Sequence, residues 1–430
     1  MDIYKVKPIF KNPRPDFSLN ISAPGSKSIT NRALMIAALA EGTSRLNGVL
    51  FSDDSRHFLA CLQDLGFDLE INEALCEVTI KGCGGRIPKA EASINVGSAG
   101  TAARFLTAML GMTGGTYHLD ASEQMRKRPM APLLEAMRSL GCEITCQSEA
   151  DHFPFTISSS GVKASEARVN IDDSSQFLSA LLMAGVSLDH DFTINVTGSH
   201  GMAYVDMTAE MMRRFGAMVA QPDARTYVVS GGCGYQAQDY MIEPDVSAAA
   251  YFYGMALLSG GNVLVRGVHS DSLQGDLAVL DAFCRMGCIK KEEPEGIRLY
   301  GAEDALIHGI DIDMHAFSDQ ALTIAAIAPY ADSPVTIRNV AHIRLQECDR
   351  MAAIVSELSR MGIDAEADGT DIIIRPGDPG SAQIETYGDH RVAMAFALTG
   401  LRAEGIVIKD PLCCRKTFEN YFKVMDEICR

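Results

Sequence analysis

The sequence lacks several features that would place it in a common class of protein. No apolar run reaches the ~18 to 20 residues that a membrane-spanning helix needs, and Phe177–Leu188 and Val392–Leu401 are typical of its longest apolar stretches. Its start, MDIYKVKPIFKNPRPDF, has no continuous apolar segment of the kind found in signal peptides. The twelve cysteines include no C-x-x-C pair, and a chain of 430 residues needs no disulfides to fold. We therefore expect a cytoplasmic protein with free thiols and no contact with a membrane.

Positive charge is also scarce. The chain has 38 Lys and Arg residues against 55 Asp and Glu residues, which gives a formal net charge of -17. A surface this acidic repels nucleic acid and anionic membranes. Any anion site must therefore be a local concentration of Lys and Arg.

Motifs for metals and cofactors are missing as well. The ten histidines form no H-E-x-x-H group, and VSGGCGY lacks the third glycine of the dinucleotide-binding G-x-G-x-x-G pattern. Neither a G-x-x-x-x-G-K-[ST] phosphate loop nor a G-x-S-x-G nucleophile elbow is present. We expect no metal and no cofactor, and the sequence favours a site for phosphorylated or carboxylated small molecules.

What the sequence does contain is a repeat of about seventy residues. Five amphipathic segments end in an apolar residue followed by glycine, the usual helix stop, and then run into a β-like stretch. The glycines are 71 to 75 residues apart, at Gly66, Gly141, Gly216, Gly287 and Gly362. A sixth amphipathic segment, KTFENYFKVMDEI, closes the chain. Internal repetition on this scale indicates an architecture built from similar supersecondary units.

A second series of helices precedes the first. Its members are apolar nearly all round, as buried helices are, and each is followed by a β-branched stretch. They begin 71 to 74 residues apart, at Ser28, Thr101, Ser175, Ser247, Asp319 and His390. One unit therefore reads buried helix, strand, surface helix and further strands, and it occurs six times. The predicted fold class is α/β.

Six units of this size fit two groups of three, because one unit alone seldom buries a sufficient core. The last unit lacks the strands that should follow its surface helix, whereas the N-terminal stretches YKVKPIF and FSLNISA have no helix of their own. Strand pairing is completed if the N-terminus joins the C-terminal group. We therefore predict a discontinuous domain, 1–24 plus 245–430, that encloses an inserted domain, 25–244.

The starts of the buried helices differ from one another, although the helix bodies are alike. Ser175, Ser247 and Asp319 are explained adequately as ordinary N-caps. Cations near a helix start are disfavoured by the helix dipole unless an anion binds there too. Four cations occupy such positions, namely Lys27, Arg32, Arg104 and Arg391. These helix starts therefore predict one shared anion site, with Asp245, Asp319 and Glu347 available for proton transfer.

Basic loops at corresponding positions in three units support this prediction. QMRKRPM holds Arg126–Arg128, IRLQECDR holds Arg344 and Arg350, and CRKTF holds Arg415 and Lys416. A lone charge cluster is more often a solvated loop than a ligand contact. Clusters that follow strands in three repeats are better candidates for one site.

Several motifs, in order along the chain, resemble the 5-enolpyruvylshikimate-3-phosphate synthase family. They are PGSKSITNRALMIAAL, SAGTAARFL, SSQFLSALLM, the Asp319 segment, R-x-x-ECDR, YGDHRVAMAF and KTFENYF. The resemblance implies an inside-out α/β barrel fold: two domains, each of three βαβαββ-type units, joined by a hinge. It also implies transfer of the enolpyruvyl group of phosphoenolpyruvate to the 5-hydroxyl of shikimate 3-phosphate, with release of phosphate, in aromatic amino acid biosynthesis.

The resemblance also assigns roles to individual residues. It implies that the inserted domain mainly holds shikimate 3-phosphate and the discontinuous domain mainly phosphoenolpyruvate. The residues implied for shikimate 3-phosphate are Lys27, Ser28, Arg32, Ser174, Ser175, Gln176, Ser199, Asp319, His342 and Gln346. Those implied for phosphoenolpyruvate are Lys27, Gly100, Arg128, Gln176, Arg350, Arg391 and Lys416. We expect Asp319 and Glu347 to share the proton transfers through a tetrahedral intermediate, with Lys27 assisting as an acid.

This chain departs from the family pattern at three of these positions. The family commonly has Lys where this chain has Gln346, and Asn where it has His342. The serine that usually precedes Pro-Tyr in the third unit has no clear match in GSHGMAYVD, and Ser199 is the candidate for it.

Two other functions fit the sequence less well. The sister reaction on UDP-N-acetylglucosamine uses the same fold, but its family usually has a reactive cysteine where this chain has EQMRKRPM. A repeat-built nucleic-acid clamp would need basic residues along its inner helices, which are apolar here. Small-molecule substrates and a monomer are therefore the expectation.

Overall fold

The computed structural model describes residues 2–430, which fold into two compact units. Unit 1 is formed by Met1–Pro24 together with Glu243–Arg430, and unit 2 by Gly25–Ile242. The second boundary therefore follows Ile242, whereas the sequence analysis placed it after residue 244. Among the described residues no helix is both long and apolar enough to cross a membrane.

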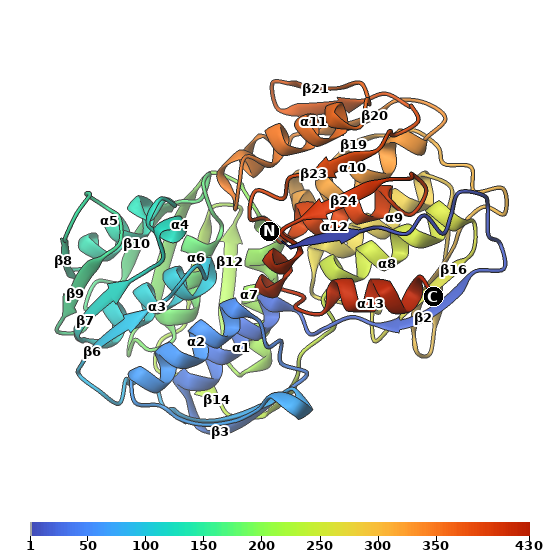
Figure 1. Cartoon of the computed structure of the whole chain (residues 1–430). Helices are drawn as coiled ribbons and strands as arrows, with labels where there is room; N and C mark the ends of the chain where they lie inside the picture. Colours follow the sequence, from blue (N-terminus) through green and yellow to red (C-terminus); the bar gives the residue numbers. More distant parts are fainter. Residues whose placement is uncertain (1) are drawn as a thin grey trace. The chain divides into compact units, whose positions relative to one another are not determined.

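Unit 2 contains three sheets whose strands come mostly from consecutive stretches of the chain (Figure 1). The strands are β3 (Ala40–Asn47), β4 (Asp68–Asn72), β5 (Glu77–Cys83), β6 (Glu91–Asn95), β7 (Gly115–Asp120), β8 (Glu143–Cys146), β9 (Phe155–Ser159), β10 (Glu166–Asn170), β11 (Phe192–Thr197), β12 (Val219–Asp223), β13 (Thr226–Val229), β14 (Tyr235–Gln236) and β15 (Asp239–Met241). The strand orders are β14-β3-β5-β4 with β15 also on β3, β6-β7-β9-β8 and β10-β11-β13-β12. Each sheet begins with a parallel pairing and continues with antiparallel strands.

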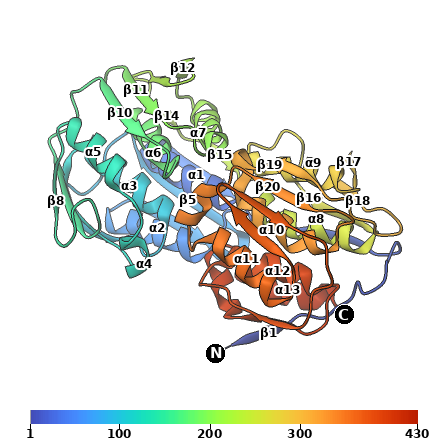
Figure 2. The same ribbon diagram turned by 90° about the horizontal axis from the view of Figure 1, so that it is seen from above.

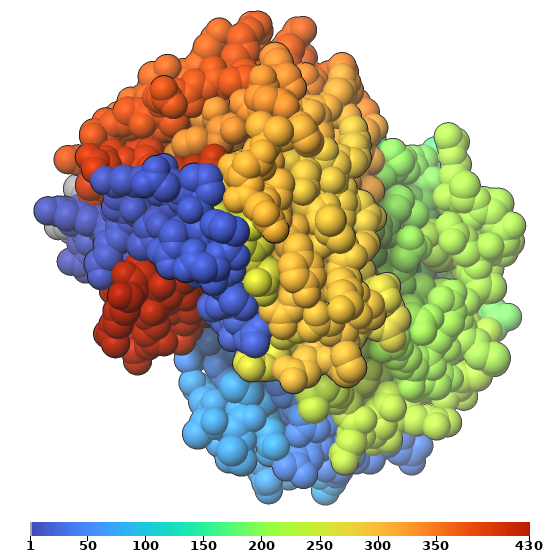
Figure 3. All heavy atoms as spheres, turned by 90° about the vertical axis from the view of Figure 1, so that its right-hand side faces the viewer, coloured from blue at the N-terminus to red at the C-terminus, as the bar shows by residue number. Residues whose placement is uncertain are grey.

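Unit 1 repeats this plan with two strands from the N-terminus. Its strands are β1 (Ile3–Lys5), β2 (Ser18–Ser22), β16 (Asn262–Arg266), β17 (Ile289–Glu293), β18 (Gly296–Tyr300), β19 (Asp311–Asp313), β20 (Val335–Arg338), β21 (Ala365–Asp368), β22 (Asp371–Ile374), β23 (Ala382–Ile384) and β24 (Ile406–Lys409). The strand orders are β17-β18-β16-β2, β19-β20-β22-β21 and β1-β24-β23. β2 lies parallel to β16, and β1 lies antiparallel to β24. The N-terminal residues accordingly lie against the C-terminal part of the chain within unit 1 (Figure 3).

Each of the six repeats contributes one helix to the interior of its unit. These helices are α1 (Lys27–Leu39), α3 (Gly100–Thr113), α6 (Gln176–Gly185), α8 (Val246–Ser259), α10 (Ala321–Ile327) and α12 (His390–Thr399). All residues of α8 and α12 are buried, as their nearly all-apolar sequences predict. Within unit 2, α3 packs against both α1 and α6 (Figure 2). Within unit 1, α8, α10 and α12 pack against one another.

A second set of helices packs against the interior helices, and a glycine follows most of them. These helices are α2 (Asp53–Asp64), α5 (Ala131–Ser139), α7 (Met202–Arg214), α9 (Val279–Arg285), α11 (Arg350–Arg360) and α13 (Tyr421–Ile428). The five repeated glycines have φ between 81° and 123°, the left-handed region that glycine enters without a steric penalty. The repeated helix stops are therefore confirmed, and so is the α/β class.

The fifth repeat differs from the prediction. The sequence predicts a buried helix that begins at Asp319. In the structure this residue lies in a 3-10 segment, η3 (His315–Gln320), and α10 begins at Ala321. Phe317 has a non-helical backbone (φ -137°, ψ 41°), which separates the two segments. Asp319 is therefore displaced from the regular helix start on which the prediction relied.

Candidate active site

In unit 2, buried polar side chains join the first turns of α1 and α3 and bind α1 to α7. Asn31 of α1 donates to the Thr101 hydroxyl of α3 at 2.5 Å. Arg32 of α1 donates to Thr208 at 2.7 Å and to the Tyr204 carbonyl at 3.1 Å, both in α7. Because these contacts involve the first turns of α1 and α3, the two predicted helix starts lie at one end of unit 2.

The Arg32 guanidinium serves this packing. Its side chain is buried, its Nε and Nη2 bond protein groups, and it lies 5.4 Å from the centre of the Phe105 ring. Burial lowers the pKa of Arg32 to about 10. Its Nη1 donates to the Ser28 carbonyl at 2.9 Å, so Arg32 also supports the backbone of a predicted substrate contact.

Lys27 is the first residue of α1. Its ammonium lies 3.7 Å from the carboxylate of Asp54, a buried residue in the first turn of α2. The Lys27 side chain remains 17% exposed, so a cation near a helix start reaches the surface beside a buried carboxylate. Peptide N–H groups and an ammonium at one helix start favour an anion.

Gly100 begins α3 and lies against two arginines. A Cβ at this position would lie 2.6 Å from Nη1 of Arg104 and 2.9 Å from Nη1 of Arg128, so no side chain fits without displacing them. Arg104 donates to the Gly100 carbonyl at 3.2 Å and to the Pro129 carbonyl at 3.0 Å. It also lies 3.4 Å from Oε1 of Gln176, the first residue of α6. Arg104 thus connects three predicted contacts: Gly100, the Arg128 loop and Gln176.

The serines before α6 form a turn beside a second turn. Ser174 accepts a hydrogen bond from the Gln176 backbone N–H at 3.3 Å, and Ser175 is buried. A Cβ on Gly201 would lie 2.6 Å from the Ser175 hydroxyl. The turn that holds Ser199 therefore approaches the start of α6, although Ser199 itself is exposed.

In unit 1, Arg350 lies at the centre of a group of charged residues. Its side chain is 1% exposed and bonds the carboxylates of Asp319, Glu347 and Asp389 at 2.9, 2.9 and 2.7 Å. Burial acts to lower the pKa of Arg350, but these carboxylates outweigh it and hold the pKa above its ordinary value. The guanidinium is therefore a permanent buried cation.

Two more cations complete this group. Arg391 bonds Asp319 at 2.9 Å, and Lys416 lies 3.2 Å from Glu347. Asp319 is thus held by two arginines, and Glu347 by Arg350 and Lys416. We call these six residues the unit 1 cluster: Asp319, Glu347, Arg350, Asp389, Arg391 and Lys416.

The unit 1 cluster is equipped both to bind an anion and to move protons. Three cations lie within bonding distance of the same carboxylates, and Arg offers the paired N–H groups that match carboxylate and phosphate. Asp319 and Glu347 lie beside these cations, and a carboxylate is a group that can accept a proton. The arrangement therefore suits two bases beside a bound anion.

The two positions that depart from the family pattern support the cluster from its edge. The His342 ring lies 2.7 Å from the Ser318 hydroxyl, next to Asp319. The Gln346 amide oxygen accepts a hydrogen bond from Nη1 of Arg350. Both side chains contact the protein beside residues of the cluster.

Comparison with known proteins identifies the family. A family model described as EPSP synthase (3-phosphoshikimate 1-carboxyvinyltransferase) matches residues 12–425. The chain belongs to this family. It is 45% identical to the 3-phosphoshikimate 1-carboxyvinyltransferase of Trichormus variabilis over 94% of each chain. It is 38% identical to the enzyme of the same name from Sulfurovum sp. over 95% of this chain and 96% of the relative.

Solved structures share the fold. The EPSP synthase of Acinetobacter baumannii superposes with a TM-score of 0.84 over 100% of this chain and 98% of that one, at 24% identity. The enolpyruvyl transferase NikO of Streptomyces tendae gives a TM-score of 0.72 over 97% and 95%, at 16% identity. The enolpyruvyl transferase fold is therefore confirmed for this member of the family.

Each of the three basic loops places one cation beside Gly100 or in the unit 1 cluster. A neighbouring cation of each loop forms an ion pair at the surface. Arg128 lies against Gly100, and Arg350 and Lys416 belong to the unit 1 cluster. Their neighbours in the sequence pair with surface carboxylates: Arg126 with Asp120, Arg344 with Asp349 and Arg415 with Glu419. Adjacent cations in a loop are therefore not equivalent.

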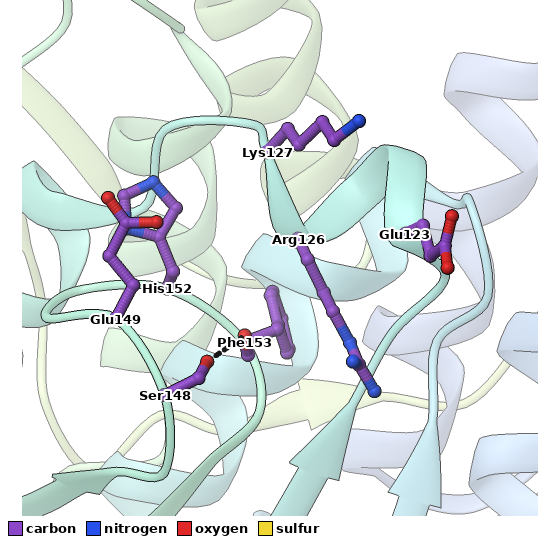
Figure 4. Close-up of a pocket in the computed structure, with 7 residues that line it drawn as sticks. All are labelled: Glu123, Arg126, Lys127, Ser148, Glu149, His152 and Phe153. Atoms are coloured by element: carbon purple, nitrogen blue, oxygen red, sulfur yellow. Dashed lines mark hydrogen bonds between the residues drawn. The ribbon is translucent and has the colours of Figure 1, made fainter.

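The Arg128 loop shows this separation clearly. It begins with a short helix, α4 (Glu123–Arg126), where the sequence analysis expected a loop. Arg126 and Lys127 extend in different directions beside a pocket of about 210 Å³ that His152 and Phe153 also line (Figure 4). Arg126 donates to the Ala121 carbonyl at 3.0 Å. The shape of this turn thus decides which cation lies beside α3.

Two residues for which the sequence predicts no substrate contact of their own, Arg104 and Asp389, connect the predicted contacts. Arg104 was noted only as a cation near a helix start, but it bonds groups from α3, the Arg128 loop and α6. Asp389 precedes α12 as its N-cap: its side chain accepts from the Arg391 N–H at 2.9 Å, and it also binds Arg350. Capping preference signalled Asp389, but nothing in the sequence indicated a partner 39 residues earlier.

Within residues 2–430, no group of three or more His, Cys, Asp or Glu side chains has an arrangement that would hold a metal ion. The i, i+4 cysteine pair Cys284 and Cys288 consists of free thiols, and burial raises the pKa of both.

Proposed function

We propose that this protein transfers the enolpyruvyl group of phosphoenolpyruvate to the 5-hydroxyl of shikimate 3-phosphate and releases phosphate, as a step in aromatic amino acid biosynthesis. Membership of the EPSP synthase family supports the reaction. The observation that carries the proposal is Arg350, a buried guanidinium that holds both candidate bases at 2.9 Å. Around it lie two more cations suited to an anionic donor.

Phosphoenolpyruvate carries a carboxylate and a phosphate, and the cations available for them lie in both units. In unit 1 these are Arg350, Arg391 and Lys416; in unit 2 they are Arg128, beside Gly100, and Lys27. Bidentate arginine contacts and helix-start N–H groups are favourable for such groups. By resemblance to the family, we propose each of these residues as a contact of the donor.

Shikimate 3-phosphate is assigned mainly to unit 2. The turn Ser174–Gln176 offers hydroxyl and amide groups at a helix start, and Lys27 supplies a cation of the same unit. Ser28 and Ser199 belong to the same proposed set, whereas buried Arg32 acts through the α1 backbone. The family resemblance also assigns Asp319, His342 and Gln346 of unit 1 to the acceptor.

Both the addition and the elimination step of the reaction need proton transfers. The 5-hydroxyl loses its proton as its oxygen bonds C2 of the enol, and the methylene carbon gains a proton to give the tetrahedral intermediate. The methyl group then loses a proton as the bond to phosphate breaks. We infer that Asp319 and Glu347 act as the bases and, once protonated, as the acids, with Lys27 supporting the leaving group.

Phosphate release by the purified protein tests the proposal. Shikimate 3-phosphate with phosphoenolpyruvate should yield one phosphate for each enolpyruvyl product. Replacing the acceptor by UDP-N-acetylglucosamine should yield none. Phosphate from the second mixture, or none from the first, would assign the chain to another reaction.

The finer expectations from the sequence are part of the proposal too. We infer that the chain works as a monomer in the cytoplasm and needs no cofactor. Sedimentation equilibrium with both substrates present would reveal a dimer directly, and activity after treatment with EDTA would reveal a metal requirement.

A further inference from the structure

A buried carboxylate that has no part in the proposed proton transfers lies next to the unit 1 cluster. Asp276 belongs to a 3-10 segment, η2 (Gly275–Ala278), and is 6% exposed. It accepts a hydrogen bond from the hydroxyl of Ser247, a buried residue in the first turn of α8. That hydroxyl lies 3.4 Å from Nη2 of Arg391, and the same nitrogen lies 2.9 Å from Asp319. Asp276 therefore connects to Asp319 through Ser247 and Arg391.

The hydrogen atoms along this connection can be assigned from chemistry. A serine hydroxyl has one hydrogen, and a guanidinium can only donate. Because Arg391 must donate to Ser247, the serine hydrogen is available only for Asp276. An ionised Asp276 thus orients the Ser247 lone pairs toward Arg391, whereas a protonated carboxyl group competes with that arrangement.

Holding the polypeptide in place does not require this carboxylate. Gln274, two residues earlier, accepts from the Val246 N–H at 3.0 Å and donates to the Pro244 carbonyl at 2.8 Å. These contacts already fasten the segment to the start of α8. A buried charge beside them costs solvation energy without adding a needed anchor.

Charged groups from three neighbouring segments act on Asp276. The pKa of Asp276 is raised to about 6, mainly by burial and also by the negative charges of Asp319 in η3 and Asp245 before α8. Arg391 in α12 and the hydrogen bond from Ser247 oppose the rise. The carboxylate is therefore mostly ionised at neutral pH and is protonated at mildly acidic pH.

We propose that Asp276 is a positioning residue for the enolpyruvyl transfer, and that it acts through Ser247 to hold the Arg391 guanidinium against Asp319. This inference rests on the proposed function. When the donor anion binds Arg391, the contact with Ser247, which is itself bound to Asp276, still holds the guanidinium in place. Protonation of Asp276 at mildly acidic pH weakens this hold on Arg391, so kcat should fall there.

Asp276→Asn tests the charge at nearly constant shape, with phosphate release from shikimate 3-phosphate and phosphoenolpyruvate as the assay. We expect kcat to fall at least fivefold, because Arg391 is no longer held against Asp319. KM for phosphoenolpyruvate should rise less than twofold, because removing a negative charge beside the cations does not weaken their attraction for the anion. The acidic limb of the kcat profile should move to lower pH by at least half a unit. Melting temperature at pH 8 should not fall, since a buried charge has been replaced by a neutral amide.

Two further variants separate positioning from a structural role. Ser247→Ala should lower kcat as Asp276→Asn does, and the double variant should be no worse than the more impaired single variant. Gln274→Ala, the matched control, should lower the melting temperature but keep kcat within twofold and leave the pH profile unchanged. If Asp276→Asn does not fold, Ser247→Ala decides the question by its kcat.

The proposal is overturned if Asp276→Asn or Ser247→Ala retains the wild-type kcat and pH profile. It is also overturned if kcat and melting temperature fall together in Asp276→Asn and Gln274→Ala to a similar extent. An inactive wild-type protein would instead contradict the proposed function. The two failures are therefore distinguishable.

Discussion

At position 350 a guanidinium group almost wholly excluded from water is surrounded by carboxylates that come from separate elements. Its partners are Asp319 in η3, Glu347 in the preceding loop and Asp389 at the start of α12. A buried ion network of this kind tolerates loss of one member poorly, because the remaining charges are left without compensation. Binding, chemistry and stability therefore depend on the same residue.

Replacing Arg350 by Met should destabilise the fold by about 3–5 kcal/mol, because three carboxylates, of which Asp389 is fully buried, lose their shared cation. Urea unfolding followed by circular dichroism measures the change. Arg338→Met is the matched control, since Arg338 also pairs with two carboxylates, Asp311 and Asp371, but at the exposed surface. It should cost roughly 0–1 kcal/mol. Equal costs for the two variants would contradict the role assigned to burial.

Asp319→Ala should reduce kcat by ~10²- to 10⁴-fold, the usual contribution of a general acid or base, while shikimate 3-phosphate still binds. Phosphate release gives the rate, and calorimetric titration gives the binding. Asp311→Ala changes an exposed aspartate of the same unit and should keep kcat within twofold. Near-normal turnover in Asp319→Ala would remove this residue from the mechanism.

The helix starts bring the predicted residues together at the scale of elements. In unit 2, Arg32 and Arg104 join α1, α3, α6 and α7 through buried contacts. In unit 1, Arg391 joins α12 to α8 and η3. Cations near helix starts, unfavourable in isolation, are accommodated because each bonds groups on a neighbouring element.

Gly100→Ala should raise KM for phosphoenolpyruvate by ~10- to 100-fold, because the added Cβ displaces the Arg104 and Arg128 guanidinium groups from the start of α3. Steady-state kinetics at saturating shikimate 3-phosphate measures this change.

Gly141→Ala provides the control for Gly100→Ala. Gly141 has φ +95° and no atom within 4 Å of an added Cβ, so the substitution strains only the backbone. It should cost roughly 1–2 kcal/mol of stability and leave KM unchanged. An unchanged KM in Gly100→Ala would show that the arginines adapt.

For the whole molecule, the decisive feature is the path of the chain between the two units. The N-terminal strands β1 and β2 complete sheets of unit 1, and the last strands of unit 2, β14 and β15, pair with its first strand, β3. Two covalent connections therefore join the units, near Pro24 and near Ile242. Such a pair of connections is compatible with the hinge that the family resemblance predicts.

If the hinge closes on anionic substrates, the radius of gyration should fall when shikimate 3-phosphate and phosphoenolpyruvate are both present. Small-angle X-ray scattering at matched ionic strength measures it. Sodium sulfate at the same ionic strength is the control for general screening and should leave the radius unchanged. An unaltered scattering curve with both substrates would contradict closure.

Sequence alone determined the repeat, the α/β class and the helices to be buried, because hydrophobic periodicity and glycine helix stops are local signals that recur every 71 to 75 residues. It also identified the residue types at the helix starts. Which cation of each basic loop joins a charged group was decided only by tertiary structure: Arg350 rather than Arg344, and Lys416 rather than Arg415. The same holds for Asp389 and Asp276, whose partners lie 39 and 29 residues away along the chain. Long-range pairing of charges depends on how the repeats pack, and that packing leaves no periodic trace in the sequence.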